Sequence, residues 1–422
     1  MAESAFDNTE NIDPSVGGDL FERYFTGEAT AQTVGAGTYF MTADYVNIAA
    51  FETSAGLLLV DCGMVEHGPT VMEEIRKLTD APLHTVVYTH GHLDHAFGLQ
   101  AWLEAGETPR VIAHENVVRR FRTYQRTGGL NAHANKVQFG IEESLHWPHD
   151  AGEFVWPDVT YRDSLTLRIG GEEFVLHHAM GETDDATWVH APERDAVAVG
   201  DLFVGILPNC GNPQKVQRYP EEWAAALEAI ASARPSLLLP GHGRPIEGAD
   251  QIRSACLETA EALRSIVDHV LEGLNAGRLH EDIVGDLRLP EHLAGRPYLD
   301  PLYDRPEFIA RNVIRKYGGW WTGHPADVLP AKKADQAKEI SALAGGSDAL
   351  VRRARELADT DMALACHLAE WAALGAPEDP EAHRCIIDLF SRRSDGEISL
   401  MGRGILSSAV RASQKALDAL GE

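Results

Sequence analysis

One short segment of the chain places four potential metal ligands within six positions: His90, His92, Asp94 and His95. An apolar, β-branched run (84–88) precedes it and an amphipathic run (99–105) follows, so the segment lies on a strand-to-helix loop. In an extended backbone, residues two apart face the same way. His90 and His92 can therefore hold one ion, while Asp94 and His95 turn toward a second after the bend. The segment predicts half of a two-metal site.

Four more potential ligands or ligand partners lie in separate short motifs. Asp61, Asp201 and His242 each follow an apolar run typical of a buried strand, and Glu182 lies in a polar Gly-Glu-Thr turn. Imidazole nitrogens and carboxylate oxygens suit zinc, with iron or manganese as alternatives.

Together these motifs resemble the metallo-β-lactamase superfamily, whose fold packs two β-sheets face to face between helices. The family's usual histidine in a Gly-His-Thr turn is replaced here by Glu182. This substitution narrows the resemblance to the type III alkylsulfatases, which use two glutamates nineteen residues apart as ligand and bridge. Glu182 and Asp201 have that spacing, with aspartate at the bridging position. The implied fold class is an α/β, αββα sandwich followed by an all-α, tetratricopeptide-like dimerisation domain.

The resemblance implies two divalent metal ions, with zinc favoured, and seven ligands that share one bridge. The first ion is assigned to His90, His92 and Glu182, the second to Asp94, His95 and His242, and both to Asp201. Asp61 is expected to orient a ligand without binding metal. Asp94 and Asp201 are also the expected catalytic carboxylates.

The glutamate at position 182 changes the charge of this site. Because Glu182 is an anion and histidine is neutral, the net positive charge of the loaded site falls by one unit. The site is therefore a weaker Lewis acid than its histidine counterpart. It still suffices to lower the pKa of a bridging water from about 15.7 toward 7, which generates hydroxide at neutral pH.

The resemblance implies a dinuclear metal-dependent hydrolase of alkyl sulfate esters or related small esters, acting through metal-bound hydroxide. One alternative is a hydrolase of the same fold that acts on another ester, a lactone, a thioester or a phosphodiester. A lesser alternative is a non-catalytic helical-repeat scaffold. The chain departs from alkylsulfatases at 209–219, where their sulfate-holding Leu-Arg-Gly-x-x-Val-Arg pattern is absent. Candidates for an anion contact are Lys215, Arg218 and Arg244.

A formal net charge of −27 makes the surface repel anions at long range. Nucleic acid is therefore an unexpected partner, and an anionic small-molecule ester needs a local basic pocket. No apolar run approaches the roughly 20 residues of a membrane span, and the first residues are acidic rather than signal-like. The composition predicts a cytoplasmic protein with no membrane partner.

The positions of glycine and proline residues, which end helices and strands, predict three regions of the chain. Short β-rich runs alternate with helical ones, such as 69–78 and 221–233, in a catalytic domain over residues 1–250. Within it, Gly170 and Gly171 predict a hairpin turn between strands at 159–161 and 174–176. A helical linker over 251–335 and a helical dimerisation domain over 336–422 follow, by resemblance to alkylsulfatases. The expected assembly is a homodimer through the C-terminal helical half, in which the aromatic residues Tyr317, Trp320 and Trp321 form a prominent cluster. Because Glu422 precedes the position of the alkylsulfatases' lipid-binding domain, we expect a shorter ester as substrate.

Overall fold

The computed structural model describes residues 29–140 and 146–422 and divides into two compact units. The first unit contains residues up to Asn131 together with His146–Gly318. The second contains Gly319–Glu422 and the stretch that begins at Ala132. Residues 251–335, predicted to form a linker, thus divide between the two units, and the predicted domain limits stay a prediction. No helix within the described ranges is long and apolar enough to span a membrane.

The first unit is built on two β-sheets. The seven-stranded sheet follows the chain order: β1 (Thr30–Gly35), β2 (Thr38–Ala43), β3 (Val46–Thr53), β4 (Gly56–Val60), β5 (Leu83–Val87), β6 (Arg110–His114) and β7 (Val159–Tyr161). Strands β1 to β4 pair antiparallel, whereas β4 to β7 pair parallel. The carboxyl ends of β4 and β5 therefore lie at the same edge.

The six-stranded sheet has the order β13-β12-β11-β10-β9-β8. Its strands are β8 (Ser164–Ile169), β9 (Glu172–Ala179), β10 (Ala186–Ala191), β11 (Ala196–Gly200), β12 (Leu237–Pro240) and β13 (Ile246–Glu247). Only β11 and β12 are parallel. The turn at Gly170–Gly171 does close a hairpin, as the glycines predict, because both adopt positive φ. Its first strand is β8; the expected first strand, 159–161, is β7 of the other sheet.

Alternate residues along the central strands separate the two sides of the second sheet. Ala196, Ala198 and Leu239 belong to a buried cluster shared with Leu58 and Val60 of the first sheet. Side chains on the opposite face, including Val197, Val199 and Leu238, join a cluster with α6 (Pro220–Ser232), α7 (Ala249–Asn275) and α9 (Pro306–Gly318). The period of two is that of strands buried on both faces. The two sheets thus pack face to face, with helices outside, which confirms the predicted α/β sandwich.

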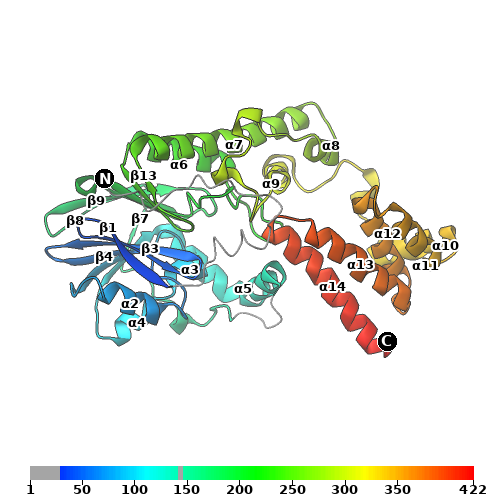
Figure 1. Cartoon of the computed structure of the whole chain (residues 1–422), viewed down its shortest axis with the longest axis horizontal. Helices are drawn as coiled ribbons and strands as arrows, with labels where there is room; N and C mark the ends of the chain where they lie inside the picture. Colours follow the sequence, from blue (N-terminus) through cyan, green and yellow to red (C-terminus); the bar gives the residue numbers. More distant parts are fainter. Residues whose placement is uncertain (1–28, 141–145) are drawn as a thin grey trace. The chain divides into compact units, whose positions relative to one another are not determined.

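Helices α2 (Gly68–Arg76), α3 (Leu93–Ala96), α4 (Gln100–Glu104) and the first part of α5 (Glu115–Phe139) cover the other sheet or connect its strands (Figure 1). Helix α8 (His280–Gly285) packs against α7 and α9 instead. Non-helical dihedrals at Thr127 kink α5, and the residues after Asn131 belong to the second unit. Helices α2 and α6 begin and end within two residues of the predicted ranges 69–78 and 221–233.

The second unit is helical. It contains α10 (Lys333–Ala344), α11 (Ser347–Leu357), α12 (Met362–Gly375), α13 (Pro380–Asp395) and α14 (Leu400–Leu420). Its core is rich in small residues, such as Ala365, Ala369 and Ala372 on one face of α12, which lets neighbouring helices approach closely. The predicted helical C-terminal region is confirmed, and its tetratricopeptide-like character stays a prediction.

Candidate metal centre

Loops at the carboxyl ends of strands from both sheets supply the predicted ligands. The loop after β5 carries the first four, from His90 to His95, and α3 begins within it. Asp201 follows β11, and His242 follows β12 by two residues. Glu182 lies in the turn that joins β9 to β10. Ligands far apart in sequence are therefore brought together by the parallel pairs β4–β5 and β11–β12 and by the packing of the two sheets.

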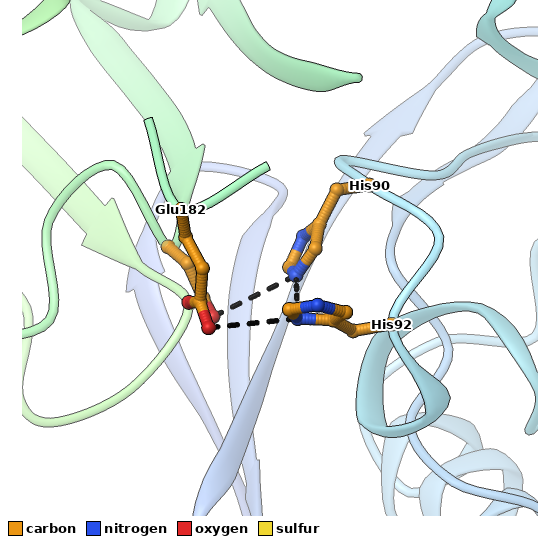
Figure 2. A group of neighbouring side chains, drawn as sticks. His90, His92 and Glu182 are labelled. Carbon is orange, nitrogen blue, oxygen red and sulfur yellow. Dashed lines mark hydrogen bonds and ion pairs between the residues drawn. The ribbon is translucent and has the colours of Figure 1, made fainter. Parts of the chain in front are cut away.

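The structure gathers the seven residues into two adjacent groups. His90, His92, Glu182 and Asp201 form one group, and Asp94, His95 and His242 form the other, each offering ligand atoms within 4.8 Å of one another. Figure 2 shows His90 and His92, from one loop, facing Glu182, which arrives from the opposite side. The Nε2 of His90 lies 2.9 Å from the Nδ1 of His92, and Glu182 Oε1 lies 3.8 Å from that Nδ1.

Asp201 lies between the two groups. Its Oδ2 is 3.7 Å from Nε2 of His90, whereas its Oδ1 is 3.3 Å from Nε2 of His95 and 3.2 Å from Nε2 of His242. On the outer side, Oδ2 of Asp94 is 3.7 Å from each of the latter two nitrogens. One carboxylate thus presents a different oxygen to each group, the geometry that a bridging ligand needs.

The outer nitrogens of the imidazoles show whether these groups fit a metal ion. Nδ1 of His95 lies 2.8 Å from Oδ2 of Asp61, and Nδ1 of His242 lies 2.7 Å from the carbonyl oxygen of Tyr45. Because a carbonyl and a carboxylate can only accept, both Nδ1 atoms carry hydrogen. The two Nε2 atoms, 3.4 Å apart, are then the nitrogens that face each other and Asp201, and a shared cation can bind both once it displaces their protons. The donor set therefore fits a divalent metal.

Burial and neighbouring charges shift the pKa values of the predicted ligands in different directions. Burial lowers the pKa of His90 to about 4 and lowers that of His92 as well, so both imidazoles are neutral and ready to bind. Burial also opposes charge on His242, but the carboxylate of Asp201 outweighs it and raises the pKa to about 9. Burial likewise opposes ionisation of Asp201, yet His242 and His95 hold its pKa well below the usual range. In the metal-free protein, protons therefore balance the charge that a cation would supply, and metal binding would release them.

Glu182 is held from behind by two polar side chains. Arg218 forms a buried ion pair with its Oε1, and Asn209 Nδ2 donates to the same oxygen at 2.7 Å. The guanidinium also donates to the carbonyl oxygen of Asn209 at 2.7 Å. Burial raises the pKa of Glu182 to about 7, and Arg218 opposes that rise.

The two neighbouring aspartates in this turn have another role. Asp185 accepts from Arg120 Nε at 2.7 Å and from the backbone N–H of Gly91 at 3.2 Å. Asp184 accepts from the same guanidinium at 2.6 Å. Both carboxylates therefore bind Arg120 of α5, and Asp185 also connects the Glu182 turn to the histidine loop. Glu182 is then the carboxylate of this turn that faces the histidines.

The three basic residues predicted to contact an anion lie in different surroundings. Arg218 is only 3% exposed and is committed to Glu182. Lys215 is half-buried, with its Nζ 5.5 Å from the centre of the Trp147 ring. Burial and then the charge of Arg218 lower its pKa to about 8, while Glu182 and Asp94 oppose that fall, so its ammonium group lies near the predicted ligands. Arg244 is exposed. Of the three, Lys215 therefore has the surroundings of an anion contact.

Sequence reasoning missed several residues that hold the centre together. Thr89 donates its backbone N–H and its hydroxyl to Asp61, both at 2.7 Å, and its hydroxyl oxygen lies 3.1 Å from Nδ1 of His90. Its place directly before the histidine motif was a usable signal. Asn209 and the carbonyl of Tyr45 carried no local signal, because they reach the site only through tertiary packing.

Two family models match the chain in consecutive regions. The model described as "Metallo-beta-lactamase superfamily" matches residues 41–242, which contain all seven predicted ligands. The model described as "Alkyl sulfatase dimerisation" matches residues 280–415.

Curated relatives are alkylsulfatases by name. A linear primary-alkylsulfatase of Pseudomonas sp. is 29% identical over 72% of this chain and 61% of that protein. The alkyl/aryl-sulfatase BDS1 of Saccharomyces cerevisiae is 24% identical over 74% of this chain and 52% of that protein. The chain thus spans little more than half the length of these relatives.

A solved structure shares the fold at greater coverage. The stereoselective inverting sec-alkylsulfatase Pisa1 from Pseudomonas sp. superposes with a TM-score of 0.83 at 20% identity, over 96% of this chain and 69% of that one. The histidine–aspartate motif, the face-to-face sheets and the two matched family regions agree. The chain is a member of the metallo-β-lactamase superfamily, in the branch whose metallo-β-lactamase domain is followed by an alkyl sulfatase dimerisation domain.

Proposed function

We propose that this chain is a dinuclear metal-dependent hydrolase of small sulfate esters. The observation that carries the proposal is the pair of ligand groups that share Asp201, whose two oxygens face opposite groups. Two adjacent groups with one carboxylate between them suit two divalent ions better than one. Zinc is the favoured metal because imidazole and carboxylate are its common ligands, with iron or manganese as alternatives.

Each part of the site has a chemical task in this proposal. Bound divalent ions lower the pKa of a coordinated water and polarise the ester oxygens. Asp94 and Asp201 would hold the ions and orient that water, and Asp94, which would bind only one ion, can accept its proton. Asp61 fixes the tautomer of His95, and Lys215 supplies a positive charge for an anionic ester in a molecule whose overall charge repels one.

Sulfate is preferred to other anions because the curated relatives are named as alkylsulfatases. The departure at 209–219, where the alkylsulfatase sulfate pattern is absent, favours a second candidate of the same class. This candidate is a metallohydrolase of another small ester, lactone, thioester or phosphodiester. Both candidates use the same metal centre, so the substrate alone distinguishes them.

One experiment tests the proposal in two steps. Elemental analysis of the purified protein should give close to two transition-metal ions per chain. The same preparation should then hydrolyse a sulfate ester faster than the matched phosphate and carboxylate esters, with activity lost to a chelator and restored by zinc. A metal-free active protein would refute the metal centre, and a preference for a carboxylate or phosphate ester would replace sulfate with the second candidate.

We also propose that the protein is a homodimer through its C-terminal helical region. The match to the alkyl sulfatase dimerisation model over 280–415 supports this assembly.

A further inference from the structure

Glu182 replaces the histidine that other superfamily members place in the same turn, and a buried arginine lies against it. This replacement alone removes one unit of positive charge from the loaded centre. We propose that Arg218 restores that charge, so that Glu182 and Arg218 together stand in for one neutral histidine. The inference deepens the proposed function and depends on a metal centre at these ligands.

The contacts make Arg218 a positioning residue for Glu182. The guanidinium forms its ion pair with Oε1, the same oxygen that lies 3.8 Å from Nδ1 of His92. Asn209 donates to this oxygen as well, so the carboxylate is oriented by two donors. With these two donors fixing the Glu182 carboxylate, its remaining lone pairs face the histidines. Residues that contact a metal ligand in this way set the orientation of that ligand.

Arg218 is itself held in place by hydrogen bonds that involve its backbone and its side chain. Its backbone carbonyl accepts from Asn312 Nδ2 at 3.0 Å, and its guanidinium donates to the Asn209 carbonyl at 2.7 Å. Arg218 is 3% exposed, and the neighbouring charges of Glu182 and Asp304 raise its pKa despite burial. A guanidinium does not lose its proton in proteins, so the compensating charge is permanent, unlike that of a lysine.

Charge arithmetic gives this pair a testable signature. With histidine at position 182, Arg218 would be left as an unpaired buried cation beside two divalent ions. Glu182→His should therefore weaken zinc binding, although histidine is the commoner ligand. Removing the arginine as well should restore binding, because a neutral ligand then has a neutral neighbour. Removing the arginine alone should weaken binding less than Glu182→His does, because Glu182 keeps its charge for the metal and Asn209 still orients its carboxylate.

The experiment is a double-mutant cycle read by metal affinity. Zinc dissociation constants are measured by competition with a chromogenic chelator for wild type, Glu182→His, Arg218→Met and the double variant. We expect Glu182→His to lose about 10- to 100-fold in affinity, the range found when the residues around a metal ligand are disturbed, because Arg218 then loses its ion-pair partner. Arg218→Met should recover most of that loss in the histidine background only.

Arg120 provides the matched control. It is also an arginine paired with carboxylates of this turn, with 12% of its side chain exposed, but its partners are Asp184 and Asp185 rather than a ligand. Arg120→Met should therefore fail to rescue Glu182→His. Should the histidine variant fold poorly by circular dichroism, the same cycle with Glu182→Gln carries the test, because glutamine keeps the shape of the side chain and removes its charge.

The outcomes separate the two proposals. A wild-type protein without metal would overturn the metal centre itself. Zinc binding by the wild type, combined with a double variant no better than Glu182→His, would overturn the charge compensation alone. Full zinc affinity in Glu182→His would do the same, because it would show that an unpaired Arg218 is tolerated.

Discussion

Asp61 orients the predicted metal ligand His95 through a hydrogen bond to its Nδ1. It accepts from Thr89 twice and from His95 once, and it holds a backbone φ of +65, a region that aspartate tolerates better than most residues. The resemblance to the metallo-β-lactamase superfamily implies an orienting role for it, because the Asp-x-Gly after a buried strand matches the family's pattern. Its partnership with Thr89 was beyond that reasoning, since it depends on β4 and β5 lying side by side.

Lys215 should give anionic substrates a pH dependence that neutral ones lack. Burial, followed by the nearby charge of Arg218, lowers the pKa of Lys215 to about 8, and bound divalent cations would lower it further. The positive charge is therefore lost as the pH rises through about 8. We expect the KM of an anionic ester to increase over this window by the equivalent of about 1.5–3 kcal/mol, the value of a hydrogen bond between charged groups.

The measurement is KM for a short alkyl sulfate and a neutral ester between pH 6 and about 9.5, a window set to span the lowered pKa. In Lys215→Arg the charge persists across the window, so the rise for the sulfate should disappear. An equal rise in that variant would assign the titration to another group. Because unfolded lysine titrates near 10.4, the lowered native pKa should also make the fold more stable as the pH rises from about 8 toward that value.

Amphipathic patterns in the sequence predicted the limits of the helices well, but the pairing of the strands poorly. The limits of α2 and α6 agree with the sequence because burial on one face repeats locally every three to four residues. The Gly170–Gly171 turn was correctly located, but the strand assigned to it belongs to the other sheet. A strand pattern says which face is buried, and it does not say which neighbour supplies the hydrogen bonds.

The close approach of β11 and β12 at their carboxyl ends should make Gly241 indispensable to the metal centre. A Cβ at Gly241 would lie 2.3 Å from Oδ1 of Asp201 and 2.7 Å from the carbonyl carbon of Gly200. The backbone atom cannot move aside, so Gly241→Ala must displace the proposed bridging carboxylate. We expect a loss of about 1–3 kcal/mol in the free energy of unfolding, the usual cost of overpacking, and weaker metal binding.

Urea unfolding and metal content measure both effects. Gly129→Ala is the matched control, because Gly129 lies in α5 with no atom within 4 Å of its would-be Cβ. Alanine there should be neutral or slightly stabilising, as helix propensity favours it over glycine. Unchanged metal content in Gly241→Ala would show that Asp201 need not keep its present position.

Across the whole chain, the long sequence separation between residues that contact one another limited which contacts the sequence could predict. Seven ligands could be named through the family resemblance, because the motifs that carry it are short and local in sequence. The ion pair of Glu182 with Arg218 could not, since 36 positions separate the two residues and only the fold brings them together. The sequence predicts an anion contact at this arginine because its charge is visible there and its ion-pair partner is not.

The proposed homodimer should bury exposed aromatic and aliphatic side chains near the start of the second unit. Trp320 is 73% exposed and Leu329 is 91% exposed, unusual values for large apolar residues. Both lie inside the region matched by the dimerisation model. A second copy of the chain that covers them would remove this surface from water, which is the main driving force for association.

Light scattering at micromolar concentration should therefore give about twice the chain mass of 46.1 kDa. Trp320→Glu together with Leu329→Glu should shift the protein toward the monomer, because two charges would have to be buried at the interface. Val216→Glu is the control, since Val216 is 71% exposed but lies in the first unit, outside the matched region, and should leave the dimer intact. A monomeric wild type would contradict the homodimer. A dimer that tolerates both glutamates would move the interface to another part of the helical region, because these two side chains would then still face water.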